Sequence, residues 1–241
     1  LSVRAGLCKG LRWKRHHRYI NGYWIGIAEP MVQDQLAQHL KSGDVFYDVG
    51  ANAGYFTLMA AHIVGDRGRV VAFDPLPENI ESVKEQIELN DFSKRTSVYE
   101  KALSDSQGTA EFSFGAAGDS TARLGQADDK RANTLQVELT TLDSILEQEL
   151  APTLIKMDVE GAEPMLVEGM FQTLLAPNPP IIIGEFNPTQ ARIAGFAPHE
   201  WIARIRDIQP TYKVYTIGSR LRRRKPDTLG GLKQMNLLLK V

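Results

Sequence analysis

Hydrophobic and polar positions alternate with two different periods along most of the chain. Short runs of β-branched and aromatic residues have the length and composition of strands, whereas apolar positions three or four residues apart are typical of helices. The predicted strands cover residues 45–50, 69–74, 96–103, 109–114, 135–139, 153–158, 180–186, 212–217 and 233–241. The predicted helices cover residues 54–64, 77–90, 142–150, 163–175 and 199–207.

The order of these elements predicts the fold class. Strands that alternate with helices form a parallel sheet with helices on both faces, which is a doubly wound α/β fold. The last two strands have no helix between them, so we expect them to pair antiparallel. We therefore predict a mostly parallel sheet with an antiparallel last strand in one globular domain, residues 43–241, preceded by a basic and helical lead-in, residues 1–42.

Composition and charge narrow the class of protein. The 241 residues carry a net charge of −1, with 43% apolar and 24% charged residues, as in ordinary globular proteins. Such a balance argues against a protein whose whole surface binds nucleic acid. The single cysteine, Cys8, excludes an internal disulfide and thiolate metal sites. No segment approaches the roughly 18–20 apolar residues of a membrane span, and we expect a cytoplasmic protein.

A glycine-rich turn, residues 48–54, joins the first strand to its helix. Ligands bind at the carboxyl ends of strands in open α/β sheets, and glycine allows the backbone to approach a ligand closely. The turn reads G-x-N-x-G, which is neither the dinucleotide motif G-x-G-x-x-G nor a phosphate loop ending in GK[ST]. Asp48 would repel a pyrophosphate and attract an ammonium group. S-adenosylmethionine, which carries an amino group and a sulfonium but no phosphate, fits this turn.

Two further acidic residues follow the next strands. Asp74 ends the second strand, where an acid accepts hydrogen bonds from ribose hydroxyls in related folds. Asp105 follows the third strand and either accepts a hydrogen bond from an adenine amino group or caps a turn before Gly108. We expect the adenine contact to be shared among Ala102, Leu103 and Asp105.

The segment KMDVEGAE, residues 156–163, places four charged residues within eight positions at the end of a predicted strand. If the strand persists, Lys156, Asp158 and Glu160 share one face, and such clusters shift pKa values and mark functional sites. Glu185 and Asn187 end the next strand and open on the same edge of the sheet. With Asp158 they offer oxygen ligands for a polar substrate group or a divalent ion, although we predict no metal site.

Six segments, DVGANAGYFTLMAA, VVAFDPLPEN, KALSD, TLDSIL, IKMDVEGAE and IIIGEF, together resemble the FkbM-type S-adenosylmethionine-dependent methyltransferases. The resemblance implies the Rossmann-like class I methyltransferase fold with a seven-stranded sheet, and methyl transfer to a hydroxyl of a sugar or secondary metabolite. The family often has Glu at the position of Asp74. From the turn, the strand ends and the resemblance we predict these cofactor-binding residues: Asp48, Gly50, Ala51, Asn52, Gly54, Tyr55, Asp74, Pro75, Ala102, Asp105 and Asp158.

The sequence defines less closely the pocket for the molecule that accepts the methyl group and the residue that accepts its hydroxyl proton. We place the acceptor pocket among residues 23–29, 115–134 and 185–187. The predicted substrate-binding residues are Trp24, Glu160, Glu185 and Asn187. The candidate proton acceptors are Asp158, Glu185 and His199.

The predicted function is therefore O-methylation of a small-molecule hydroxyl by S-adenosylmethionine, with S-adenosylhomocysteine as product. We expect a small-molecule acceptor rather than a nucleic acid as partner. Two alternatives remain. A nucleic-acid methyltransferase would grip phosphates with the basic segment 220–225, and a binding module would keep the cofactor pocket without transferring a methyl group. The turn opposes a dehydrogenase.

Overall fold

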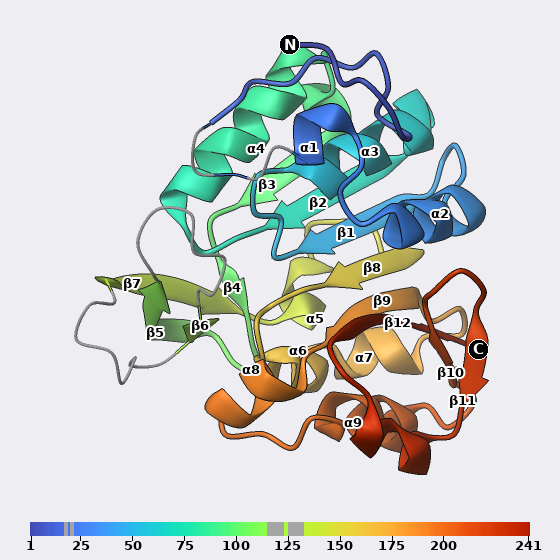
Figure 1. The fold of residues 1–241 in the computed structure, drawn as a ribbon. Coiled ribbons are helices and arrows are strands. Elements are labelled where there is room, and N and C mark those ends of the chain that lie inside the picture. The colour runs from blue at the N-terminus through green and yellow to red at the C-terminus, as the bar shows by residue number, and fades with distance from the viewer. Residues whose placement is uncertain (17–18, 20–21, 115–122, 125–132) are drawn as a thin grey trace.

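The computed structural model describes residues 1–241 except 17–18, 20–21, 115–122 and 125–132. An eight-stranded sheet with the order β11-β10-β12-β9-β8-β1-β2-β3 runs through the centre of the molecule (Figure 1). Its strands are β1 (Val45–Val49), β2 (Arg69–Phe73), β3 (Thr96–Tyr99), β8 (Leu154–Met157), β9 (Ile181–Phe186), β10 (Lys213–Thr216), β11 (Arg222–Arg224) and β12 (Met235–Lys240).

The strand directions confirm a mostly parallel sheet with an antiparallel last strand. Strands β3, β2, β1, β8 and β9 pair parallel, whereas β12 lies antiparallel to both β9 and β10. The predicted number of seven strands is wrong, because Arg222–Arg224 form an additional strand, β11, antiparallel to β10. Three consecutive arginines carry no apolar alternation, and charged residues of this kind are typical of edge strands.

Helices cover both faces of this sheet. Alternate side chains of the strands enter separate cores, with Phe46 and Val70 in one and Tyr47 and Val71 in the other. The first face carries α2 (Pro30–His39), α3 (Tyr55–Val64) and α4 (Pro77–Leu89), and the second carries α5 (Leu142–Ile145), α6 (Glu163–Glu168), α7 (Phe171–Leu175) and α9 (Glu200–Ile208). The remaining helical segments are α1 (Gly22–Ile25), α8 (Pro188–Ile193), η1 (Gly65–Arg67), η2 (Ser93–Arg95) and η3 (Pro226–Gly231). No helix in the described part of the chain is long and apolar enough to cross a membrane.

One predicted helix is divided in the structure, and another ends earlier than expected. The predicted helix 163–175 is two helices, α6 and α7, because Gly169 interrupts it where the backbone packs against Ser104. A Cβ at Gly169 would lie 1.9 Å from the Ser104 carbonyl oxygen. The predicted helix 142–150 ends at Ile145, and the Gln148 N–H then bonds the Ile145 carbonyl in a tighter i→i−3 turn.

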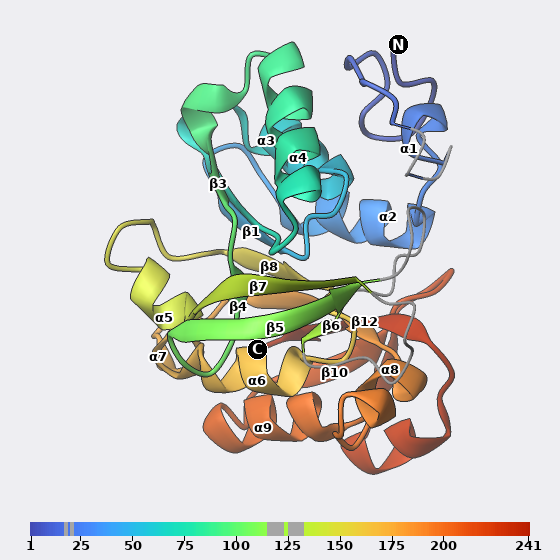
Figure 2. The ribbon, with the colours of Figure 1, turned by 90° about the vertical axis from the view of Figure 1, so that its left-hand side faces the viewer.

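A second, four-stranded sheet with the order β4-β7-β5-β6 lies beyond the carboxyl ends of the parallel strands (Figures 1 and 2). It consists of β4 (Ala102–Leu103), β5 (Gly108–Phe114), β6 (Arg123–Leu124) and β7 (Asn133–Thr140). The predicted strand 96–103 is thus divided between β3 and β4, which belong to different sheets. The predicted strands 109–114 and 135–139 correspond to β5 and β7, which pair antiparallel. Most of the expected loop 115–134 lies outside the described residues.

The N-terminal residues lie against α4. The Arg12 N–H donates to Asn90 Oδ1 at 2.8 Å, and the Lys14 N–H donates to Gln86 Oε1 at 2.9 Å. Trp13 is buried in the same core as Phe46 of β1. The division of the chain at residue 42 stays a prediction.

Candidate active site

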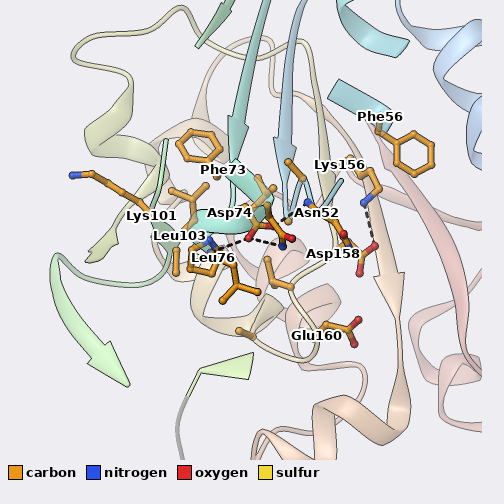
Figure 3. A pocket seen from close by; sticks show the side chains of 18 of the residues that line it. Asn52, Phe56, Phe73, Asp74, Leu76, Lys101, Leu103, Lys156, Asp158 and Glu160 are labelled. Carbon is orange, nitrogen blue, oxygen red and sulfur yellow. Dashed lines mark hydrogen bonds and ion pairs between the residues drawn. The ribbon is translucent and has the colours of Figure 1, made fainter. Parts of the chain in front are cut away.

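A pocket opens at the carboxyl ends of β1 and β2 (Figure 3). Segments far apart in the sequence line it, from Tyr23 in the N-terminal region to Ala162 after β8. The predicted site residues that line it are Gly50, Ala51, Asn52, Tyr55, Asp74, Pro75, Ala102, Asp158 and Glu160.

The glycine-rich turn after β1 forms one wall of the pocket. Gly50, Asn52 and Gly54 all have left-handed backbone angles, with φ of 81°, 49° and 85°. A Cβ at Gly50 would lie 1.9 Å from the Asp158 carbonyl oxygen, so the turn passes β8 at a distance that only glycine permits. The left-handed conformation of Asn52 is one that asparagine tolerates better than most residues. The sequence pattern G-x-N-x-G therefore encodes the path of the backbone.

Asp74 fixes this turn from the end of β2. Its Oδ2 accepts a hydrogen bond from the Asn52 N–H at 2.9 Å, and its Oδ1 accepts from the Leu76 N–H at 3.0 Å and Asn79 Nδ2 at 2.9 Å. Burial raises the pKa of the Asp74 carboxyl, against the opposing effect of these hydrogen bonds. Because a carboxylate offers about four acceptor positions, these three hydrogen bonds leave one position free.

Asp48 lies beneath the pocket rather than in its lining. The residue is 0% exposed, and its Oδ2 accepts from Thr57 Oγ1 at 2.6 Å. Its Oδ1 is buried and has no hydrogen-bond partner in the described part of the chain. Burial raises the pKa of Asp48 to about 6, although the positive charge of Lys156 acts in the opposite direction. Asp48 therefore acts on the pocket mainly through its charge.

Lys156 is a buried cation in the wall between Asp48 and Asp158. The residue is 3% exposed, its Nζ donates to Asp158 Oδ2 at 3.1 Å, and it lies 5.0 Å from the centre of the Phe56 ring (Figure 3). Burial alone would lower the pKa of Lys156, but the surrounding carboxylates, Asp158 first, raise it above the ordinary value. β8 ends at Met157, so the strand does not persist to Asp158 and Glu160 as the expectation of a shared face required. Lys156 and Asp158 nevertheless contact each other through this ion pair.

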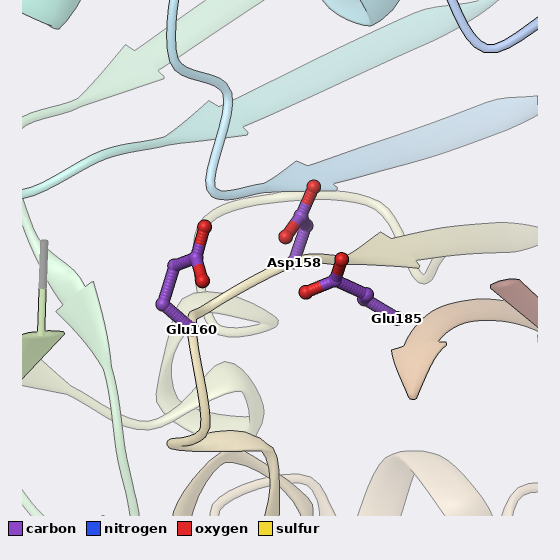
Figure 4. Close-up of side chains that lie close together, drawn as sticks. All are labelled: Asp158, Glu160 and Glu185. Atoms are coloured by element: carbon purple, nitrogen blue, oxygen red, sulfur yellow. The ribbon is translucent and has the colours of Figure 1, made fainter. Parts of the chain in front are cut away.

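The carboxylates of Asp158, Glu160 and Glu185 form a cluster that we call the acidic rim (Figure 4). One oxygen of each lies within 4.8 Å of the others. Burial and then the charges of Asp158 and Glu185 raise the pKa of Glu160 to about 8, and burial followed by Asp158 raises the pKa of Glu185. Like charges this close oppose full ionisation of neighbouring carboxyl groups. Such a group can accept a proton or bind a cation.

Several predicted site residues lie away from the pocket. Asp105 is exposed and accepts one hydrogen bond each from Ser104 and Ser106. His199 is exposed at the start of α9, and the Trp24 ring lies under the Arg15 guanidinium near the N-terminus. Gly54 lies behind the turn, Glu185 reaches the site through the acidic rim, and Asn187 caps α8. Their assigned roles stay predictions.

The pocket also contains residues that the sequence did not single out. Leu76 and Asn79 lie two and five positions after Asp74, so their place just beyond that strand end was the available signal. Phe112 comes from the second sheet and had no local signal. From the N-terminal segment 23–29, Glu29 lines the pocket in a left-handed conformation with φ of 43° and accepts a hydrogen bond from Asn236 Nδ2 at 3.0 Å.

The chemistry of the lining fits S-adenosylmethionine. Leu76, Ala102 and Phe112 line the pocket and belong to one buried apolar cluster, which offers a surface suited to a flat adenine ring, and Asp74 is two positions from Leu76 in the chain. Asp158 faces the pocket and Asp48 lies behind it, so the opposite side is negative, as an ammonium and a sulfonium require. Both lysines of the lining are unsuited to a pyrophosphate, because Lys156 is paired and Lys101 extends outward (Figure 3).

The sequence model of the family described as "Methyltransferase FkbM domain" matches residues 48–210. Among curated proteins, "Protein-L-isoaspartate O-methyltransferase 1" of Arabidopsis thaliana is 35% identical over 98 residues, which cover 38% of this chain and 43% of that protein. The chain therefore spans less than half the length of this relative.

Two solved structures show the same fold. Methyltransferase FkbM from Methylobacillus flagellatus superposes with a TM-score of 0.54 and 16% identity, covering 82% of this chain and 44% of that one. A precorrin-6y C5,15-methyltransferase from Geobacter metallireducens has a TM-score of 0.52 and 10% identity, covering 94% of this chain and 93% of that one. At these identities the likeness concerns the fold alone.

Proposed function

This chain belongs to the FkbM methyltransferase domain family, and on that premise we propose that it transfers the methyl group of S-adenosylmethionine to a hydroxyl oxygen of a small molecule. The observation that carries this proposal is the junction of two surfaces in one pocket. An apolar side suited to adenine continues into the acidic rim, where carboxylates of high pKa can take up a proton.

Each part of the pocket has a share in orienting the reactants. When bound, S-adenosylmethionine supplies an electrophilic methyl group attached to a sulfonium, and the leaving group in the transfer to an acceptor oxygen is a neutral thioether. Asp74 holds the ribose, and Asp158, fixed by Lys156, attracts the ammonium group. Phe112 and Leu103 cover the apolar side and exclude water, so the reacting atoms are held in line.

We assign the role of proton acceptor to Glu160. As the new carbon–oxygen bond forms, the hydroxyl proton passes to the Glu160 carboxylate, and the electrons of the broken carbon–sulfur bond stay on sulfur. The sequence placed Glu160 among the substrate-binding residues and offered Asp158, Glu185 and His199 as proton acceptors. Of these three, His199 is exposed outside the pocket, Asp158 is paired with Lys156, and Glu185 does not line the pocket, whereas Glu160 does. The pKa of Glu160, about 8, is close to the value that suits a base near neutral pH, and a bound cationic cofactor lowers it further.

The acidic rim also favours a hydroxyl over a carboxyl acceptor. The name of the Arabidopsis relative points to methylation of a carboxyl group, but an acceptor carboxylate would meet three acidic side chains here. A nucleic acid is disfavoured for the same reason. The arginines of β11 lie five strands from β1, about 24 Å at ordinary strand spacing, so phosphates held there are remote from the pocket.

Methylation assays with isotope-labelled S-adenosylmethionine test this proposal. Calorimetry should show that S-adenosylhomocysteine binds and NAD does not. The labelled product should resist mild alkali, because methyl ethers are stable there and methyl esters are not. Binding of S-adenosylhomocysteine without transfer to any acceptor would favour the binding module instead.

The variant Glu160→Gln tests the role of Glu160 as proton acceptor. It should bind S-adenosylhomocysteine normally and lose transfer by about 100-fold or more, the usual contribution of a general base. Glu147→Gln is the matched control, because Glu147 is exposed beyond α5. Full activity of Glu160→Gln would contradict its role.

A further inference from the structure

Two residues of the cofactor pocket lie outside the part of the chain that the family model matches. Tyr23 and Glu29 line the pocket, whereas the model matches residues 48–210. Tyr23 belongs to α1, and Glu29 directly precedes α2. The family match therefore assigns a role to neither residue. The segment 23–29, which the sequence placed in the acceptor pocket, thus also reaches the cofactor pocket.

Contacts from two directions hold Glu29 in this wall. Its left-handed backbone, with φ of 43°, is costly for a residue other than glycine. The preceding turn is fixed by Gln33, whose Nε2 donates to the Ala28 carbonyl at 2.7 Å and to the Gly26 carbonyl at 3.2 Å. From the sheet, Asn236 Nδ2 donates to Glu29 Oε2 at 3.0 Å. A strained residue that its surroundings hold in place is typical of a ligand-binding position.

The order of the strands places Glu29 at the end of the pocket away from the adenine wall. That wall follows β2, whereas Asn236, which holds Glu29, belongs to β12 on the opposite side of β1. The charges of Lys156 and Asp158 act on both the Glu29 carboxyl and the Tyr23 hydroxyl, so these four groups share one end of the pocket. A cofactor with its adenine on the apolar wall extends its amino-acid end toward them.

Glu29 and Tyr23 each keep a polar atom available for a ligand. Glu29 forms no ion pair in the described part of the chain, and its Oε1 has no hydrogen-bond partner there, whereas Lys156 pairs with Asp158. The Tyr23 ring stacks on Tyr55 with centroids 5.1 Å apart, and its hydroxyl forms no hydrogen bond among the described residues. Burial raises the pKa of Tyr23 to about 12, so the hydroxyl keeps its proton at neutral pH. This wall therefore offers one acceptor and one donor.

We propose that Glu29 and Tyr23 bind the amino-acid end of S-adenosylmethionine. Glu29 Oε1 accepts hydrogen bonds from the ammonium group, which Asp158 also attracts, and the Tyr23 hydroxyl donates to the carboxylate. An amino-acid end carries these two charged groups on the same carbon, so it matches an acceptor and a donor in one wall. The inference rests on the cofactor of the proposed function and not on the acceptor.

Calorimetry with a truncated cofactor tests the role of Glu29. The ligand 5′-methylthioadenosine lacks the whole amino-acid end of S-adenosylhomocysteine. Glu29→Gln should raise the Kd of S-adenosylhomocysteine about tenfold, as expected for a lost hydrogen bond between charged groups, and leave the Kd of 5′-methylthioadenosine unchanged. An unchanged Kd for S-adenosylhomocysteine would overturn the assignment. An equal rise for both ligands would also overturn it, because Glu29 would then only shape the pocket.

The variant Tyr23→Phe tests the second contact. It should raise the Kd of S-adenosylhomocysteine about fivefold and leave the Kd of decarboxylated S-adenosylhomocysteine unchanged, because that ligand keeps the ammonium group but has no carboxylate. An equal effect on both ligands, or none on either, would refute this contact.

Two matched controls remove the same groups outside the pocket. Glu88→Gln changes an exposed residue of α4, and Tyr215→Phe removes a hydroxyl from β10. Neither should change the Kd of any of the three ligands. A loss of binding in these controls as large as in Glu29→Gln or Tyr23→Phe would refute a specific contact.

The same measurements separate this inference from the proposed function. A wild-type chain that does not bind S-adenosylhomocysteine contradicts the cofactor of the proposed function itself. A Glu29→Gln variant that binds S-adenosylhomocysteine normally but has a raised KM for the acceptor contradicts only this inference, because Glu29 would then belong to the acceptor pocket.

Discussion

Replacing Lys156 by methionine should destabilise the protein strongly and in a pH-dependent way. Methionine keeps much of the length of the side chain and its contact with the Phe56 ring but removes the charge. In the wild type, the Lys156 ammonium lies 3.1 Å from Asp158 Oδ2 and also acts on the buried Asp48. The variant therefore leaves two carboxylates without their cation.

The size of the effect follows from distance and burial. At 3.1 Å and an effective dielectric constant of about 20, one pair of unit charges attracts by about 5 kcal/mol. Removing the lysine also removes its own desolvation cost, which offsets part of this loss. Measured losses for one partner of a buried ion pair are about 3–5 kcal/mol, and we expect Lys156→Met to fall in this range at pH 8.

The pH dependence comes from Asp48. Its pKa in the folded protein is about 6, raised from 3.8, so the folded state binds this proton more tightly than the unfolded state. The associated stability is present at low pH and lost as pH rises through about 4 to 6. Without Lys156 the pKa of Asp48 rises further, and each added unit costs about 1.4 kcal/mol at pH 8. The variant should therefore be less impaired at pH 6 than at pH 8.

Urea unfolding at pH 6 and pH 8 measures both quantities. Lys94→Met, at an exposed position, is the matched control and should leave the free energy of unfolding nearly unchanged. In the double variant Lys156→Met, Asp48→Asn, the neutral amide should restore part of the stability at pH 8. A loss below about 1 kcal/mol, or one that is equal at both pH values, would refute the electrostatic reasoning.

Three further predictions concern the pocket. The rate of methyl transfer at low acceptor concentration should fall as pH drops below the pKa of Glu160, about 8 or lower with cofactor bound, and Glu160→Gln should lack this limb of the pH–rate profile. Gly50→Ala should cost more than about 2 kcal/mol in urea unfolding, because its Cβ would lie 1.9 Å from the Asp158 carbonyl oxygen; an unchanged midpoint would contradict this close approach of the turn to β8. Asp74→Asn should weaken binding of S-adenosylhomocysteine by about tenfold in calorimetry, because an amide cannot accept all the hydrogen bonds of the carboxylate, including the one from the Asn52 N–H.

Local pattern was enough to predict most of the large sheet and its helices. Strands such as β1 and β2 are short runs of mostly apolar residues between segments typical of turns, and the apolar character of these runs was enough to predict that they are buried. The glycine-rich turn was also predictable, because its left-handed residues, Gly50 and Asn52, are of the types that adopt this conformation. The predictions that failed did so because of contacts between distant parts of the chain. Strand β11 is stabilised by pairing with β10 and not by its own composition, and Gly169 interrupts a helix because a distant carbonyl lies against it.

The sequence by itself determined the fold class, the family and the identity of the acidic strand ends. Only the tertiary structure decided which of these charges meet and what each one does. Glu160 and Glu185 lie 25 positions apart in the chain, yet β8 and β9 are neighbours, so their carboxylates share one rim. Asp48 and Asp74 follow similar strands, but one lies beneath the pocket and the other in its wall. The physical reason is that burial and the distance to other charges set the pKa and the role of a carboxylate, and both arise only when the elements pack together.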